Sequence, residues 1–222
     1  MDAEGQKSHL KAYGITYWAL NKQQDVKWLL NYRGGSFLIP FVDSIEKECL
    51  IRGVSYELLS NQKVESILNE IKSPSKNMDA VILEKAPKIA VYSPNGNQPW
   101  DDAVTMVLTY AEIPYETIYD TEVLNDALLL YDWLHLHHED FTGQYGKFYR
   151  AYRNAAWYIE QQQAAEVLAS SLGYIKVSDQ KLAVAEKIRE YVLGGGFMFA
   201  MCSATDSFDI ALAAQELDIC EP

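Results

Sequence analysis

The feature that most constrains the fold is a series of short apolar runs after residue 87, separated by longer segments with helical patterning. The runs read "KIAVYS", "PYETIYD", "YDWLHLHH" and "GFMFAMC", and the clearest helical segments read "DDAVTMVLTYAEI", "EQQQAAEVLASSLG", "DQKLAVAEKIREYVLGGG" and "TDSFDIALAAQEL". Strands that alternate with helices predict an open parallel sheet covered on both faces. Because "GFMFAMC" is apolar on both of its faces, we expect it to be a central strand. The prediction for residues 87–222 is therefore an α/β, flavodoxin-like domain.

Residues 1–86 lack this regular alternation of strands and helices, and their pattern predicts a small N-terminal α+β unit. The segments "AYGITYWAL" and "VKWLLNY" are rich in aromatic and β-branched residues, which indicates strands. "SIEKECLIRG" reads as a short helix that Ser44 caps and Gly53 ends. "VSYELL" reads as a strand and "NQKVESILNEI" as an amphipathic helix.

Charge and cysteine content exclude several classes of partner and site. The net charge of −12 argues against nucleic acid and anionic membranes as partners, because both require a basic surface. No apolar run approaches the roughly 20 residues of a membrane span, so we expect no membrane insertion. Three widely spaced cysteines form neither a disulfide framework nor a CxxC metal site. We predict a small-molecule ligand, and we assign no cofactor, no metal and no oligomeric state.

In open parallel sheets ligands bind at the carboxyl ends of the strands, and three segments would meet there. They are the loop at residues 93–100, which carries Asn95, the stretch at residues 137–146, and Cys202 with the helix that follows it. Cys202 joins a buried strand to a helix, which resembles the sharp turn that carries a catalytic nucleophile. Ala200 and Ala204 supply the small neighbours that such a turn needs. The alternative is a small buried cysteine at a strand end.

Three of the four histidines fall in the stretch at residues 131–146, directly before two carboxylates. Strand alternation places Trp133, His135, His137 and Glu139 on one face of the sheet. We predict a catalytic group of Cys202, His138 and Glu139, and a ligand-binding group of His135, His137, Asp140, Thr142, Gly143, Asn95, Ser203 and Asp206. A metal ion held by His135, His137 and Glu139 is an alternative. So is a structural role, with these side chains hydrogen-bonded beneath the segment that follows.

The motifs "HLKAYGITYW", "WLLNYRGGSF", "PWDDAVTMVLTYAEIPYETIYD", "YDWLHLHHEDFTGQYGKFY" and "GGGFMFAMCSATDSFDIALAA" resemble a family of Bacteroidetes proteins that often carry the label "asparagine synthetase B". The resemblance covers nearly the whole chain. The second region is similar in layout to class I glutamine amidotransferase-like domains, including the ThuA-like branch. This resemblance implies a hydrolase with Cys202 as the elbow cysteine and an oxyanion loop near residues 138–143. Relatives of this kind look exported and extend beyond both ends of this chain. The resemblance therefore implies an exported or periplasmic location and an α/β domain that is incomplete at its C-terminal end.

Two departures from the family pattern define the alternatives. Ala200 and Ala204 replace the elbow glycines, and every histidine lies upstream of the cysteine, whereas the family has its partner histidine downstream. Asparagine synthetase activity is not expected, because Asp2 occupies the position of the required N-terminal cysteine and "CSATDS" lacks the phosphate-loop glycines. The first hypothesis is therefore an amidotransferase-like hydrolase domain. The second is a non-catalytic module of ThuA-like type that binds a small molecule or a carbohydrate.

Overall fold

The computed structural model describes residues 6–94, 102–143, 146–217 and 219 of the chain. The chain divides into two compact units, each described by itself below. The first comprises residues 1–86 and 99–114, and the second comprises residues 87–98 and 115–222. Residues 99–114, which sequence patterning places in the α/β domain, therefore group with the first unit.

The first unit is built on a three-stranded antiparallel sheet in the order β2-β1-β3. Two apolar clusters cover its two faces: α1 and α2 pack on one face, around Val26, and α3 packs on the other, around Leu29. The elements are α1 (His9–Asn21), β1 (Val26–Leu30), η1 (Tyr32–Gly34), β2 (Ser36–Leu38), α2 (Asp43–Arg52), α3 (Asn61–Ile71), β3 (Asp79–Leu83) and α4 (Ala103–Ala111).

Helix α4 belongs to the first unit because it packs tightly on α1. A Cβ atom added to Gly14 would lie 1.8 Å from the carbonyl oxygen of Ala111, so only glycine allows this approach. The Lys11 ammonium and the Glu112 carboxylate form an ion pair at 2.6 Å beside the contact. This pair and hydrogen bond lower the pKa of Glu112.

Several expectations for the first unit are wrong. "AYGITYWAL" lies in helix α1 and not in a strand, because its buried residues Ala12, Ile15, Thr16 and Ala19 repeat at helical spacing and form one packed face. Burial of that face outweighs the β-propensity of the aromatic residues. The segment "VSYELL" forms no strand among the described residues. Helix α2 begins at Asp43, so Ser44 lies in its first turn and is not the cap.

Other expectations for the first unit are confirmed. Gly53 ends α2 in the left-handed conformation, with φ of 68°. Helix α3 covers "NQKVESILNEI", and the Ser60 side chain caps it by accepting a hydrogen bond from the Lys63 amide.

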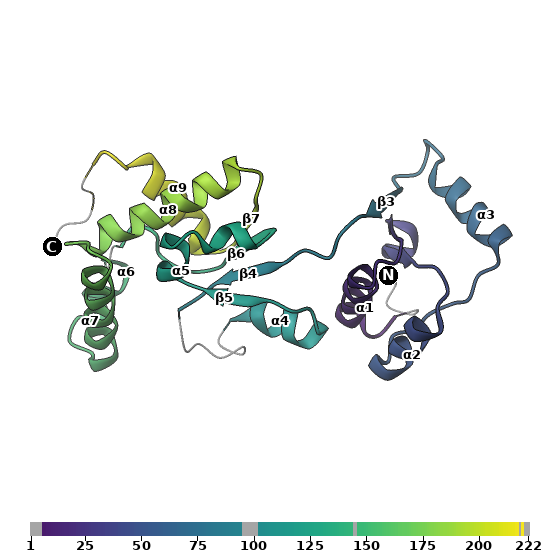
Figure 1. Ribbon diagram of the computed structural model, residues 1–222, viewed down its shortest axis with the longest axis horizontal. Helices are drawn as coiled ribbons and strands as arrows, with labels where there is room; N and C mark the ends of the chain where they lie inside the picture. The colour runs from purple at the N-terminus through teal and green to yellow at the C-terminus, as the bar shows by residue number, and fades with distance from the viewer. Residues whose placement is uncertain (1–5, 95–101, 144–145, 218, 220–222) are drawn as a thin grey trace. The chain divides into compact units, whose positions relative to one another are not determined.

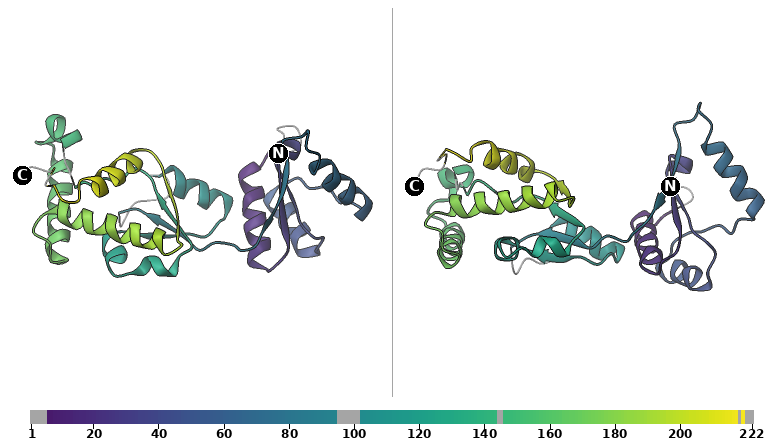
Figure 2. Two further views of the ribbon diagram at one scale, coloured as in Figure 1. Left: turned by 90° about the horizontal axis from the view of Figure 1, so that it is seen from above. Right: turned by 45° about the horizontal axis from the view of Figure 1, so that its top comes forward.

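The second unit is an α/β unit with a four-stranded parallel sheet in the order β5-β4-β6-β7, an arrangement compatible with a flavodoxin-like fold. Helices α8 and α9 lie side by side along one face of the sheet, as Figures 1 and 2 show. The elements are β4 (Ile89–Tyr92), β5 (Glu116–Ile118), α5 (Asp120–Leu124), η3 (Ala127–Leu130), β6 (Trp133–Leu136), α6 (Gly146–Tyr152), α7 (Ala156–Ser171), α8 (Val177–Leu193), β7 (Phe197–Ala200) and α9 (Ser203–Ala213).

The core of the second unit follows from strand alternation. Leu134 and Leu136 of β6 point toward α8, where Val184 and Ile188 meet them, and all four side chains are fully buried. Burial of one such side chain contributes about 1.5–3 kcal/mol to folding. Strand β7 is not the central strand predicted from its apolar sequence. It is an edge strand, and Phe197 and Phe199 on the face opposite α8 are 58% and 48% exposed.

Candidate functional site

The carboxyl ends of β6 and β7 lie side by side, so the histidine segment and Cys202 meet at one edge of the sheet. Three hydrogen bonds join the two: the Ala204 amide donates to the His137 carbonyl (3.2 Å), the Ser203 hydroxyl to the His138 carbonyl (2.9 Å) and the Ser207 hydroxyl to the Glu139 carbonyl (2.9 Å). The first turn of α9 thus fixes the backbone of the histidine segment. The third predicted segment falls largely outside the described residues, and Asn95 is among those not described.

Cys202 occupies a strained turn between β7 and α9. Its backbone has φ of 52° and ψ of −139°, a combination that costs a residue with a side chain roughly 1–3 kcal/mol. The residue is exposed, and buried Ala204 lies directly beneath the turn. This is the backbone geometry by which a strand-to-helix elbow presents a nucleophile to solvent. The Ser203 amide beside it is the first of α9, where an N–H has no partner within its own helix.

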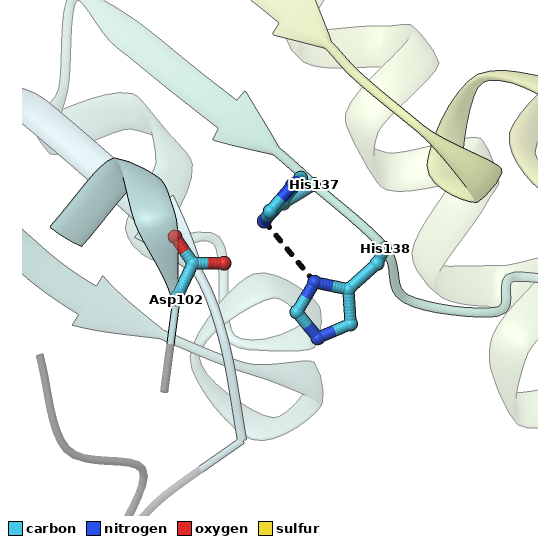
Figure 3. Close-up of side chains that lie close together, drawn as sticks. All are labelled: Asp102, His137 and His138. Atoms are coloured by element: carbon cyan, nitrogen blue, oxygen red, sulfur yellow. Dashed lines mark hydrogen bonds between the residues drawn. The ribbon is translucent and has the colours of Figure 1, made fainter. Parts of the chain in front are cut away.

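His137 and His138 follow the end of β6 and face one another. Their Nδ1 atoms lie 3.1 Å apart, and the ring centroids are 4.7 Å apart with the ring planes at 72°. Figure 3 draws this contact as the dashed line between the two imidazoles.

The third side chain in that view, Asp102, belongs to the first unit. Its carboxylate accepts hydrogen bonds from the Val104 and Thr105 amides and caps α4.

His135 lies within β6 and is only 2% exposed. Its ring stacks on Phe199 of the neighbouring strand, with centroids 5.7 Å apart and an interplanar angle of 22°. The ring of His137 lies 6.3 Å from it. His135 is therefore a buried residue of the sheet next to His137, and solvent does not reach it. Among the described residues of the second unit, no three acidic, cysteine or histidine side chains bring their ligand atoms within 4.8 Å of one another, so His135, His137 and Glu139 do not converge.

The predicted ligand-binding residues after Glu139 form a compact turn. The Asp140 carboxylate accepts hydrogen bonds from the amide (2.9 Å) and the hydroxyl (2.7 Å) of Thr142, which is an Asx-turn. Gly143 has φ of 69°, and a Cβ atom there would lie 2.7 Å from the Cα atom of Ser178. These contacts give the residues a role in shaping the loop. Asp206, also predicted, lies exposed in the first turn of α9, where its charge complements the helix dipole.

A buried ionic cluster at the ends of β4 and β5 was not predicted from the sequence. The Lys181 ammonium of α8 donates to both carboxylate oxygens of Asp120 (2.9 and 2.8 Å) and to the hydroxyls of Tyr92 and Tyr119 (3.0 Å each). The Tyr92 hydroxyl also donates to Asp120. Lys181, Asp120 and Tyr92 are 6%, 1% and 1% exposed. The signal was present: Lys181 shares one helical face with Val184, Ala185 and Ile188, all of them buried.

The cluster shifts the pKa of its own members. Burial and then the Asp120 charge raise the pKa of Tyr92 well above its usual value of 10.0. Burial lowers the pKa of Lys181, but Tyr119 and Asp120 outweigh it, and the net pKa is raised above 10.5. The Glu139 carboxylate also raises the pKa of Tyr92 and of Tyr119. Glu139 is 9% exposed, so the predicted catalytic carboxylate is a buried neighbour of this cluster.

The first unit contains a cavity of about 1080 Å³. Apolar side chains such as Ile15, Phe37 and Ile45 line it, together with the charged residues Arg33 and Glu57. No residue that the sequence predicts to belong to the site is among those that line this cavity. Its lining includes Ile15 and Ile45 from one face of the sheet and Leu29 and Ile67 from the other, so it is an extended groove that is open to solvent.

No described helix of the chain has the length and apolar character that crossing a membrane requires. No family model, no curated protein and no solved structure matches the chain.

Proposed function

We propose that the second unit is a cysteine-dependent hydrolase domain of the class I glutamine amidotransferase-like type, with Cys202 as its nucleophile. The observation that carries this proposal is the backbone of Cys202, which combines φ of 52° with ψ of −139° on an exposed residue between β7 and α9. Strain of this kind persists only where the surrounding structure enforces it, and it clusters at active sites. A cysteine with no chemical task gains nothing from this conformation.

We assign the other roles of an amide hydrolase to groups at the same edge of the sheet. The Cys202 sulfur attacks the carbonyl carbon of an amide while the His138 imidazole takes the thiol proton. The Ser203 amide, at the N-terminus of α9, donates to the oxyanion of the tetrahedral intermediate. His138 then returns the proton to the departing amine, and water hydrolyses the thioester in a second step. We assign no step to Glu139, because its side chain is buried and its charge raises the pKa of Tyr92 and Tyr119 in the buried cluster.

The rate at which iodoacetamide alkylates Cys202 at neutral pH tests the proposal. A free thiol is only a few per cent ionised at pH 7, so activation by the site raises the rate about tenfold or more over that of N-acetylcysteine. Peptide mapping separates Cys202 from Cys49, which is buried and serves as the internal reference.

Two variants make the test specific to the site. His138→Gln is expected to return the Cys202 rate to that of a free thiol, whereas His9→Gln, a change in the first unit, leaves it unaltered. The proposal is contradicted if Cys202 of the parent protein is labelled no faster than N-acetylcysteine. It is also contradicted if Cys202 is labelled at equal rates in the parent and in His138→Gln.

A second candidate function rests on the cavity of the first unit, whose volume is about 1080 Å³. In that reading the chain binds a small molecule without chemistry. Phe41 lines the cavity and is 60% exposed, so Phe41→Ser alters the lining without disturbing the core. We expect this substitution to weaken binding of the fluorescent probe 1-anilinonaphthalene-8-sulfonate, and Cys202→Ala to leave it unchanged. Equal binding by the parent and Phe41→Ser contradicts this reading.

A further inference from the structure

The two imidazoles at the end of β6 are placed unusually for neighbours in sequence. Side chains of consecutive residues in a strand point to opposite faces of the sheet. Strand β6 ends at Leu136, however, and the change in backbone direction beyond it brings His137 and His138 together, with 3.1 Å between their Nδ1 atoms. A hydrogen bond between two imidazoles requires one ring to donate and the other to accept. The two nitrogen atoms therefore already share one hydrogen.

The distance between these nitrogen atoms is close to that of two histidine ligands on one metal ion. With Zn–N bonds of about 2.0–2.1 Å in a tetrahedral site, two ligand nitrogens lie about 3.3 Å apart. The observed separation of the Nδ1 atoms is 3.1 Å. An ion can therefore replace the shared hydrogen after a small outward rotation of the rings.

The surrounding structure holds the pair in place. The carbonyl groups of His137 and His138 accept hydrogen bonds from α9, at 3.2 and 2.9 Å. Beneath His137 lies the buried ring of His135, itself stacked on Phe199. Ligands fixed in this way lose little conformational entropy when they bind an ion. The ring of His138 is exposed, so an ion can reach the pair from solvent.

We propose that His137 and His138 bind one borderline divalent transition-metal ion, such as Zn²⁺ or Cu²⁺, through their Nδ1 atoms. Imidazole nitrogen is a preferred ligand of both ions. On binding, the Nδ1 hydrogen moves through solvent to Nε2 of the same ring, so that both rings bind as neutral imidazoles. Water, or an oxygen or nitrogen atom of a small ligand, fills the remaining coordination positions. This site uses neither His135 nor Glu139. It shares His138 with the hydrolase proposed above, and an imidazole that binds an ion through Nδ1 and holds a hydrogen on Nε2 cannot also take the thiol proton, so the two uses of His138 are alternatives.

Titration of the full chain without an affinity tag tests the site. Zn²⁺ is added in competition with a chromophoric chelator, and Cu²⁺ binding is followed by electron paramagnetic resonance. We expect one ion per chain and hyperfine structure from two imidazole nitrogens. His138→Gln changes an exposed side chain and is expected to weaken binding at least tenfold, since removal of even an outer partner of a metal ligand costs 10–100-fold. His137→Gln has the same expected effect, with circular dichroism to verify the fold.

The matched controls are His9→Gln, which removes the one histidine of the first unit, and Cys202→Ser, which removes the nearby thiol. Both are expected to retain the affinity of the parent protein. Affinity that is unchanged in His138→Gln, or lost in His9→Gln, overturns the proposal. Loss in Cys202→Ser overturns it as well, because the thiol would then be a ligand.

Discussion

The carboxyl edge of the parallel sheet has a buried half, at the ends of β4 and β5, and an open half, at the ends of β6 and β7. Polar groups lie in opposite environments in the two halves. At the ends of β4 and β5 the charges of Lys181 and Asp120 are buried, and two tyrosine hydroxyls complete their hydrogen bonds. At the ends of β6 and β7 the thiol of Cys202 and the ring of His138 are open to solvent, and the backbone is strained. A satisfied buried cluster fixes geometry, whereas an exposed, strained turn is available for chemistry. The difference is consistent with structural work for the buried cluster and with the reactivity that we propose for the exposed turn.

The largest effect is expected from removing one charge of the buried half. Asp120→Ala leaves the Lys181 ammonium buried without its counter-charge, which costs about 3–5 kcal/mol of the free energy of unfolding. Urea denaturation measures the loss. The double variant Asp120→Leu/Lys181→Met is expected to recover much of it, because no charge is then buried.

The control is a second ion pair of the same helix, Lys187–Asp126, with the same 2.8 Å separation but exposed to solvent. Asp126→Asn is expected to change stability little, because solvent screens that pair and asparagine tolerates the left-handed backbone of this residue. Equal losses in Asp120→Ala and Asp126→Asn would mean that burial does not distinguish the first cluster.

Gly143 tests how tightly the loop of the open half is built. Gly143→Ala places a methyl group 2.7 Å from the Cα atom of Ser178 and also strains a left-handed backbone. We expect a loss of about 1 kcal/mol from the backbone and a further ~1–3 kcal/mol from the steric overlap. Gly173 has φ of 88° with open space around it, so Gly173→Ala shows the backbone cost alone. Equal denaturation midpoints for the two variants would contradict the close packing at Gly143.

Alkaline pH is expected to weaken the buried half. An unfolded tyrosine loses its proton near pH 10, whereas Tyr92 keeps its proton in the folded protein because its pKa is raised. Lys181 likewise holds its proton beyond its usual pKa of 10.5. The folded state thus binds more protons, and stability falls as the pH rises above about 10, by roughly 1.4 kcal/mol per pH unit for each such proton. Urea midpoints between pH 8 and 12 should fall less steeply in Tyr92→Phe, and an unchanged slope would exclude Tyr92 as a source.

The smallest expected effect is a gain in stability in the open half. Cys202→Gly relieves the backbone strain, worth about 1–3 kcal/mol, but loses part of the gain to the greater freedom of glycine in the unfolded chain. A net stabilisation of about 1 kcal/mol is expected in thermal or urea denaturation. Cys202→Ala keeps the positive φ and is expected to be close to neutral. A destabilised glycine variant would show that the turn is not strained.

The parallel sheet was predictable because its strands are short apolar runs between clear helical patterns. Strand β4 and helix α8 appear where the sequence places them. Helix α1 was not predicted, because the aromatic and β-branched residues of "AYGITYWAL" favour a strand locally and only packing against the sheet reveals the helical face. The edge position of β7 was also not predictable, because an apolar strand has the same sequence pattern at the edge of a sheet as between two other strands.

The candidate site was predictable in its position more than in its contacts. The rule that ligands meet the carboxyl ends of parallel strands brought His137, His138 and Cys202 to one edge, and the hydrogen bonds between the β6 loop and α9 place them there. Alternation could not reveal that His138 turns back toward His137, because the pattern stops where the strand stops. Lys181 was missed although it lies on the apolar face of α8, because a lysine in a helix is normally solvated.

The hydrogen bonds that α9 donates to three successive carbonyl groups, at residues 137, 138 and 139, also determine how this edge fluctuates. Segments tied together in this way open as one cooperative unit in native-state hydrogen exchange. The Ala204 amide should therefore exchange with solvent only when the histidine loop also detaches. The elbow and the imidazoles would then lose and regain their working arrangement together, in a single event of local unfolding.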